Sequence, residues 1–155
     1  MLKYCLDKWN QNKGLLEEKL KKDSTLNYCD YSYLVKLVVD FILNTGEDSP
    51  DGMRWNSENI TMIDNGGYQG TQLFMIPLET YQPSEYEYLI TYVGYGSCSG
   101  CDTLLSIQNW GDKPLTEIQV KDFMTLCKDI VTNIVKPYNC GWRSKEGFEE
   151  VTVNG

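Results

Sequence analysis

Apolar residues recur with a helical period over the first third of the chain. Their spacing of three and four predicts a helix over residues 2–21, loosened by the polar run at 10–14. A wider apolar stripe predicts a second helix over residues 31–44, buried on most of its circumference. Cys5 lies on the first stripe, and we interpret it as a core residue because free cysteine packs as a small hydrophobe. A loop rich in helix-breaking residues, 44–56, ends this region.

The period then changes from helical to extended. Residues 59–63, 70–78 and 86–95 show the alternation or the continuous apolar run that is typical of strands. The turn Asp64–Gly67 joins the first two as a hairpin, and its Asn and Gly residues tolerate positive φ. Because strands that follow one another in sequence usually pair as neighbours, these segments predict a three-stranded antiparallel sheet.

Helical spacing returns in the last third of the chain. A short helix is predicted over residues 102–108. The final helix begins at a capping box formed by Thr116 and Gln119. Its apolar stripe continues toward Pro137 and includes Cys127, which we also interpret as a core residue.

The order of these elements defines the predicted fold class. Two helices, three strands and two further helices form an α+β protein, in which the helices pack on one face of a small antiparallel sheet. The length of 155 residues suits a single domain, 1–155. Residues 139–155 have no clear period, so we expect an irregular or frayed tail, or an added edge strand at 149–153.

The net charge of −8 is concentrated in the middle of the chain. From Trp55 to Asp112 there is no Lys or Arg, against seven acidic residues: Glu58, Asp64, Glu79, Glu85, Glu87, Asp102 and Asp112. Such a surface repels phosphate backbones and disfavours nucleic-acid binding, whereas it suits a basic protein surface, a cation or simply solubility. Neither a membrane-spanning apolar run nor a signal-peptide pattern is present, and we expect a soluble cytoplasmic protein.

The face of the sheet opposite the helices is a candidate binding surface. We expect it to present tyrosines and carboxylates between two glycine-rich loops, 64–70 and 94–102. Tyrosine is a preferred anchor at protein interfaces, although it is also common in strands for structural reasons alone. The candidate residues are Asp64, Tyr68, Gln69, Glu85, Glu87, Tyr95, Ser97, Ser99 and Asp102.

The turn that ends at Asp102 contains a C-x-x-C motif between a strand and a helix. A redox site is one hypothesis, but the carboxylate of Asp102 next to Cys101 would raise rather than lower the pKa of that thiol. A zinc site is a second hypothesis, because two further cysteines could complete a set of four thiolates. The four zinc ligands would be Cys98, Cys101, Cys29 and Cys140.

Two other interpretations of this turn need no thiol chemistry. Ser97, Ser99 and nearby backbone N–H groups could hold an anion at the start of the helix, although the surrounding acids oppose it. Alternatively the turn is structural, with glycines that allow a tight crossing, Ser99 or Asp102 capping the helix, and cysteines that fill small spaces.

Histidine is absent from the sequence, which excludes Ser/His and Cys/His mechanisms. Paired carboxylates such as Asp64 and Asp102 remain conceivable as acid and base, or as ligands of a divalent metal, if their two loops meet. We therefore expect a non-enzymatic protein without a cofactor, zinc being the alternative.

Three segments carry a resemblance to a known family. They are Asp64–Gly70 with its Tyr-Gln-Gly motif, Tyr95–Leu104 with its Gly-Ser-Cys-Ser-Gly-Cys-Asp run, and Gln119–Leu126. In these segments, and more broadly over residues 55–137, the chain resembles small proteins with no assigned activity that are carried by bacteriophages, prophages and related mobile elements.

The resemblance implies a setting rather than a mechanism. Such proteins are expressed in the cytoplasm of a bacterial host, typically Gram-positive, where small acidic phage products often bind and inhibit host or defence proteins. We expect a protein-binding, inhibitory factor whose partner is a host protein. The alternative is a zinc-binding or thiol-redox protein centred on Cys98 and Cys101.

Overall fold

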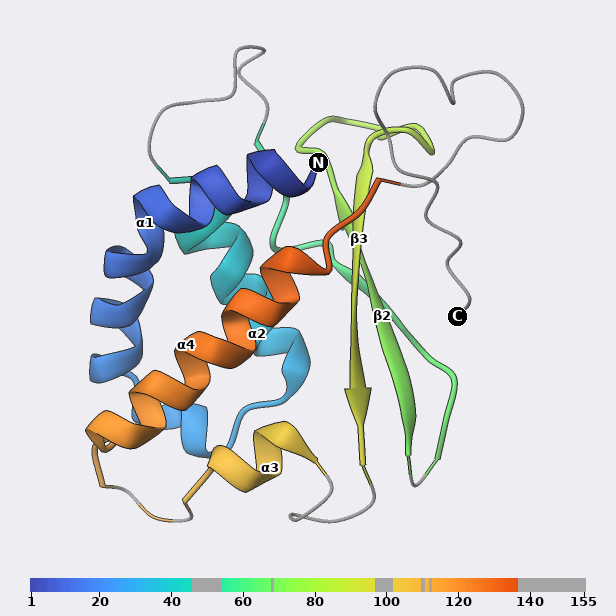
Figure 1. Cartoon of the computed structure of the whole chain (residues 1–155). Helices are drawn as coiled ribbons and strands as arrows, with labels where there is room; N and C mark the ends of the chain where they lie inside the picture. The colour runs from blue at the N-terminus through green and yellow to red at the C-terminus, as the bar shows by residue number, and fades with distance from the viewer. Residues whose placement is uncertain (46–53, 68, 97–101, 110, 112, 137–155) are drawn as a thin grey trace.

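Helices cover one face of a three-stranded antiparallel sheet in the computed structural model, which describes residues 1–45, 54–67, 69–96, 102–109, 111 and 113–136 (Figure 1). The helices are α1 (Leu2–Lys22), α2 (Tyr31–Val38), α3 (Thr103–Ile107) and α4 (Glu117–Thr132), with a 3-10 helix η1 (Ser24–Asn27) and a π-helix η2 (Val39–Leu43). The strands β1 (Thr61–Asp64), β2 (Gly70–Pro77) and β3 (Tyr88–Tyr95) lie in the order β1-β2-β3. The predicted α+β class is confirmed.

The first helix is continuous, so the predicted loosening at residues 10–14 is wrong. Figure 1 shows the axis of α1 changing direction near the middle of the helix, but helical structure continues through it. Asn12 explains the polar run, because its side chain is buried and donates to the carbonyls of Ile42 at 2.8 Å and Thr45 at 2.7 Å. A polar residue on the inner face of α1 thus satisfies carbonyls at the carboxyl end of η2.

The second predicted helix changes type part of the way along. The α-helix ends at Val38, and η2 continues with the wider turns of a π-helix, in which Asn44 N donates to Val39 O at 2.9 Å. The Asn44 side chain then pairs with both backbone groups of Trp55, at 2.7 and 2.8 Å. These bonds join the two ends of the predicted 44–56 loop, of which residues 46–53 lie outside the described part of the chain.

The sheet presents alternate residues to the helices. Thr91 is fully buried, and its hydroxyl donates to Ile130 O of α4 at 2.7 Å. The first strand begins later than expected, at Thr61, and all of its residues are exposed. On the other edge of the sheet, Ile90 exchanges two backbone hydrogen bonds with Val135, each of 2.8 Å. The predicted edge strand at 149–153 lies outside the described residues.

The core between helices and sheet contains the cysteines that were predicted to be buried. Cys5 and Cys127 are both fully buried, and the capping box of Thr116 and Gln119 is present at the start of α4. Gln119 also donates to Asn27 Oδ1 and to Ile107 O, each at 3.0 Å, and so joins three segments.

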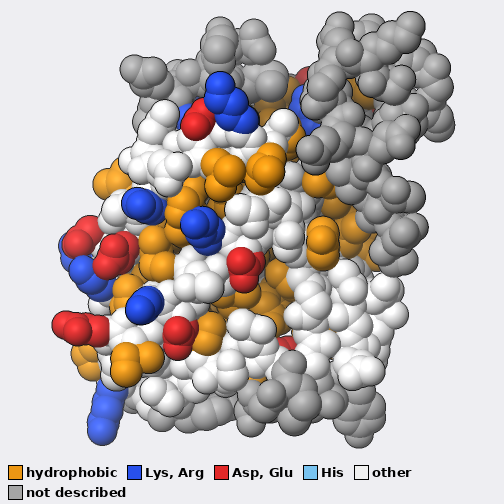
Figure 2. All heavy atoms as spheres, in the orientation of Figure 1, with side chains coloured by type: hydrophobic (Ala, Val, Ile, Leu, Met, Phe, Trp, Pro, Cys, Tyr) orange, Lys and Arg blue, Asp and Glu red, His pale blue; other side chains and the backbone are white. Residues whose placement is uncertain are grey.

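Figure 2 shows charged side chains of both signs over the helical part of one face, whereas its part nearer the sheet is mostly hydrophobic or uncharged. None of the helices within the described residues is long and apolar enough to span a membrane.

The buried side chain of Asn12 provides a test of the contact between α1 and η2. The Asn12→Ala substitution removes one buried and one partly buried hydrogen bond, so we expect the free energy of unfolding to fall by about 1–3 kcal/mol. Urea unfolding followed by circular dichroism measures the change. Gln11→Ala, at the exposed neighbouring position, is the matched control and should stay within about 0.5 kcal/mol of wild type. Equal stability of the two variants would contradict the role of Asn12.

Asp23 provides a test in the pH dependence of stability. Burial alone raises the pKa of Asp23, but hydrogen bonds from Thr25 and Tyr33 and the proximity of Lys19 outweigh burial and lower the pKa. The stabilisation is therefore present above the pKa of an unfolded Asp, about 3.9, and is lost as the pH falls through the lowered folded pKa.

The Asp23→Asn variant has no carboxyl group at this position, so protonation of residue 23 cannot change its stability. We expect the difference in free energy of unfolding between wild type and variant to shrink as the pH falls from about 6 to about 2.5. Urea titrations at several pH values measure that difference. A difference that stays constant over this range would show that the pKa of Asp23 is the same in the folded and unfolded states.

Candidate functional site

Asp64 lies exposed at the end of β1, where three hydrogen-bond donors hold its carboxylate. Oδ1 accepts from the Tyr95 hydroxyl at 2.6 Å and from Gly66 N at 2.9 Å. Oδ2 accepts from Gln72 Nε2 at 3.3 Å. The donors come from β3, the turn and β2, so the carboxylate is fixed in direction although it faces solvent.

Pairing across the sheet explains how Tyr95 reaches Asp64. Asp64 lies opposite Gln72, and Tyr95 lies opposite Gly70, so all four residues share the face of the sheet from which Thr91 bonds α4. The prediction that Asp64 and Tyr95 lie on the face opposite the helices is therefore wrong. Tyr95 is on β3 and must extend across β2 to reach β1. Gly70 has no side chain in the path of the ring, an arrangement in which an aromatic residue covers a glycine of the neighbouring strand.

Gly66 and Gly70 of the hairpin are needed for close approach rather than for positive φ. A Cβ atom on Gly66 would lie 2.2 Å from Gln69 O, and one on Gly70 would lie 2.8 Å from Gly66 Cα. Of the described residues only Gly111 has a positive φ, of 141°, so this turn does not use the positive φ that its Asn and Gly residues tolerate. Gln69 is exposed beside the turn, and Tyr68 lies outside the described residues.

The hydrogen bonds set the protonation states of Asp64 and Tyr95. The Tyr95 hydroxyl, with Gly66 N, lowers the pKa of Asp64, and the same bond to Asp64 raises the pKa of Tyr95. Asp64 is therefore ionised at neutral pH and Tyr95 remains a donor. A general acid or base works best with a pKa near the operating pH, and both shifts move away from it. The pair suits charge presentation better than proton transfer.

Asp102 is buried, and the prediction that it belongs to an exposed surface is wrong. Only 6% of the residue is exposed. Its Oδ1 accepts from Tyr31 OH at 2.8 Å and Leu105 N at 3.1 Å, and its Oδ2 accepts from Gly96 N at 3.2 Å. The predicted role of Asp102 as the cap of the following helix is confirmed. Asp64 and Asp102 therefore have separate partners and do not form a pair.

Tyr31, the first residue of α2, completes the contact at Asp102. Its hydroxyl donates to Asp102 and accepts from Leu104 N at 3.1 Å. Burial raises the pKa of Tyr31, and the neighbouring Asp102 raises it further, so the hydroxyl keeps its proton. The start of α2 is thereby joined to the start of α3. No periodic pattern in the sequence indicated this contact between residues so far apart.

The predicted acidic residues divide between the two ends of the sheet. Pro77 and Tyr88 pair at one end of β2 and β3, and Gly70 and Tyr95 pair at the other. Glu85 and Glu87 precede β3 and lie at the first end, whereas Asp64 lies at the second. The seven steps from Tyr88 to Tyr95 correspond to roughly 23 Å of strand. A single compact contact with a partner therefore cannot include both Asp64 and the pair Glu85 and Glu87.

The thiol hypotheses depend mainly on residues outside the described part of the chain. Cys98, Cys101 and Cys140 lie there, as do Ser97 and Ser99. Cys29 is half-buried, its thiol donates to Leu26 O at 3.4 Å, and burial raises its pKa to about 12. Such a thiol stays protonated at neutral pH unless a metal displaces its proton. Within the described ranges no three cysteine or acidic side chains form a metal-binding group. The zinc site stays a prediction.

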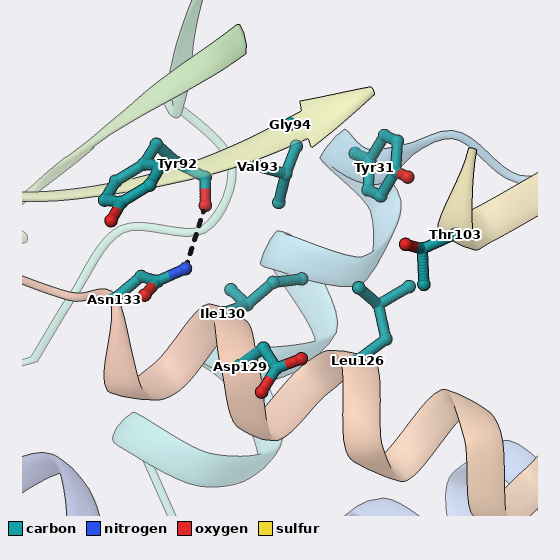
Figure 3. Close-up of a pocket in the computed structure, with 9 residues that line it drawn as sticks. All are labelled: Tyr31, Tyr92, Val93, Gly94, Thr103, Leu126, Asp129, Ile130 and Asn133. Carbon is teal, nitrogen blue, oxygen red and sulfur yellow. Dashed lines mark hydrogen bonds between the residues drawn. The ribbon is translucent and has the colours of Figure 1, made fainter. Parts of the chain in front are cut away.

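A pocket of about 160 Å³ between β3 and α4 was not predicted from the sequence. We call it the β3–α4 pocket; Figure 3 shows the residues that line it. Gly94 of β3 borders it from the sheet, Thr103 from α3, Asp129 from α4 and Asn133 from the position that follows α4. Gly94 begins the glycine-rich loop 94–102 that the sequence indicated as part of a candidate site. The order of elements along the chain did not indicate that α4 lies beside it.

Comparisons of the chain with protein-family models, with curated proteins and with solved structures find no match. A fold by itself does not determine a function. The function of this protein therefore has to be inferred from the side chains that its fold places together.

The buried contact of Asp102 can be separated from a surface role by substitution. Asp102→Ala leaves Tyr31 OH, Gly96 N and Leu105 N without their acceptor, so we expect the free energy of unfolding to fall by about 2–4 kcal/mol. Asp64→Ala, at the exposed position, is the control and should leave stability close to that of wild type. Denaturant unfolding of both variants measures the effect. An Asp102 variant with wild-type stability would return Asp102 to the surface candidates.

Proposed function

We propose that this protein is a non-enzymatic binding factor that attaches to a basic surface of a host protein in a bacterial cell and inhibits it. The binding surface is the hairpin end of the sheet, which we call the hairpin-end surface and define by Met62, Asp64, Gln69, Gln72 and Tyr95. The observation that carries the proposal is the exposed Asp64 carboxylate, fixed by Tyr95, Gly66 and Gln72.

A carboxylate held in this way suits recognition of a cation. Exposed acidic side chains usually rotate freely, and a partner must restrict them when it binds, which weakens the complex. Asp64 is already restricted, by donors that are neutral. Its negative charge is therefore not cancelled locally, and the absence of Lys and Arg from Trp55 to Asp112 leaves the surrounding sequence anionic. Complementary charge accelerates association and selects among partners.

The hairpin-end surface also offers apolar contact beside the charge. Met62 lies on the same side of β1 as Asp64, and it is 43% exposed. Tyr95 is partly buried and packs against the core, so its ring is a rigid contact area. Protein interfaces combine such apolar and aromatic anchors with a polar rim. The resemblance to phage-encoded proteins supports a host protein as the partner.

A capture experiment with a charge-reversal variant tests the proposal. The full-length protein is immobilised and exposed to lysate of a Gram-positive bacterium, and retained proteins are identified by mass spectrometry. The Asp64→Lys variant should lose the partner, with an affinity at least about tenfold weaker when the purified partner is titrated by calorimetry. Tyr95→Phe keeps the charge but removes its main donor, and it should weaken binding to a smaller extent.

Glu85→Lys is the matched control for Asp64→Lys. It makes the same change in charge at an exposed position, but at the opposite end of the sheet. Capture by this variant should equal that of wild type. Absence of any protein retained specifically by wild type would contradict the binding function. Loss of capture with Glu85→Lys but not with Asp64→Lys would contradict the assignment of the surface.

A further inference from the structure

The β3–α4 pocket has an apolar floor and a polar border. Val93, Leu126 and Ile130 are buried and form the floor. Figure 3 shows Val93 directed from the strand and Leu126 and Ile130 from the helix, with Thr103 beyond Leu126. Thr103 and Asp129 are exposed, and within the described part of the chain neither the Thr103 hydroxyl nor the Asp129 carboxylate has a hydrogen-bond partner. The pocket therefore presents acceptors that the fold itself does not use.

The edge of β3 that does not pair with β2 adds a backbone acceptor. Ile90 uses both its N–H and its carbonyl to bond Val135, away from β2. In an antiparallel ladder every second residue is directed to the same edge, so Tyr92 and Gly94 are directed there as well. The Tyr92 carbonyl follows this rule, because it accepts from Asn133 Nδ2 at 3.4 Å. The next such carbonyl, that of Gly94, borders the pocket and has no partner among the described residues.

The size of the pocket limits its occupant. Pockets for small-molecule ligands usually measure about 300–1,000 Å³. A volume of about 160 Å³ is suited to one amino-acid side chain instead. Asp129 is the only charged residue among those that line the pocket, all of which are described, so the occupant is expected to be cationic. The apolar floor matches a methylene stem, which long basic side chains bury while their charge stays near water.

We propose that the β3–α4 pocket is a socket for a lysine side chain of the partner protein. Three acceptors border it, namely the Asp129 carboxylate, the Thr103 hydroxyl and the Gly94 carbonyl, and a lysine ammonium has three N–H donors. A compact ammonium fits acceptors on three different elements, whereas the planar guanidinium of arginine prefers a two-oxygen acceptor such as a carboxylate. The inference rests on the proposed function, because it names the group on the basic surface that the protein recognises.

The test uses a probe and not the unidentified partner. Nα-acetyl-lysine N-methylamide is titrated into the ¹⁵N-labelled full-length protein and followed by NMR. We expect saturable shifts centred on the amides of Gly94, Thr103 and Asp129, with a dissociation constant on the order of millimolar because a single side chain binds. The norleucine analogue, which has the apolar stem without the ammonium, should bind at least about tenfold more weakly.

Two variants identify the acceptors. Asp129→Asn should weaken binding of the lysine probe about tenfold, because a hydrogen bond to a charged group is lost. Thr103→Val keeps the shape of the side chain and should weaken it about threefold. Asp122→Asn is the matched control, since Asp122 is exposed on the same helix, seven residues earlier and roughly 10.5 Å away along its axis. Binding by this variant should be unchanged.

Several results would overturn the lysine socket. They are the absence of saturable shifts, equal binding of the norleucine probe, unchanged binding by Asp129→Asn, and tighter binding of the matching arginine probe. The host partner is not part of this titration, so its result is independent of the capture experiment. Failure of the titration with capture intact removes only the socket. Failure of capture with the titration intact leaves a lysine site and removes the proposed function.

Discussion

The buried carboxyl group of Asp102 joins the end of the sheet to two helices, and both candidate binding features depend on where it holds them. It accepts from Gly96 N just after β3, from Tyr31 at the start of α2, and from Leu105 N in α3. Burying a carboxyl group is unfavourable unless its oxygens are satisfied, and here three donors satisfy them. The last residues of β3 are therefore fixed against the helical layer and not left as a free strand end.

The end of β3 divides its residues between the two candidate features. Tyr95 is directed across β2 to Asp64, whereas the backbone of Gly94 is directed to the free edge and borders the β3–α4 pocket. This division follows from the alternation of side chains and backbone groups along a strand. A displacement of β3 against α2 and α3 would consequently alter both features together. The glycine-rich turn is important mainly because it begins and ends at these anchored positions.

Much of the fold follows from periodicity, but the site depends on distances that periodicity does not contain. The helices, the strands and the capping box at Thr116 are predicted correctly because each is a local pattern. Alternation assigns Glu87 and Asp64 to faces of strands, but not to ends of the sheet, and they lie at opposite ends. Asp102 was assigned to the surface together with its glycine-rich loop, 94–102. Its burial depends on Tyr31, a contact across 71 residues. Asn12 was interpreted as part of a polar run that loosens the helix. Its partner on η2, Ile42, is likewise distant in sequence, so no local pattern indicates the contact.

Charge compensation distinguishes Asp64 and Asp129 from the paired acids elsewhere in the described chain. Asp23 lies 3.6 Å from Lys19, Glu79 lies 3.8 Å from Arg54, and Glu58 contacts Lys36. A nearby cation cancels most of the field of such an acid beyond its own ion pair. Asp64 is held by neutral donors, which fix its direction without cancelling its charge. Asp129 has no cationic partner among the described residues. Asp64 on β1 and Asp129 on α4 therefore each present a negative charge that no ion pair cancels, which favours contact with a basic partner.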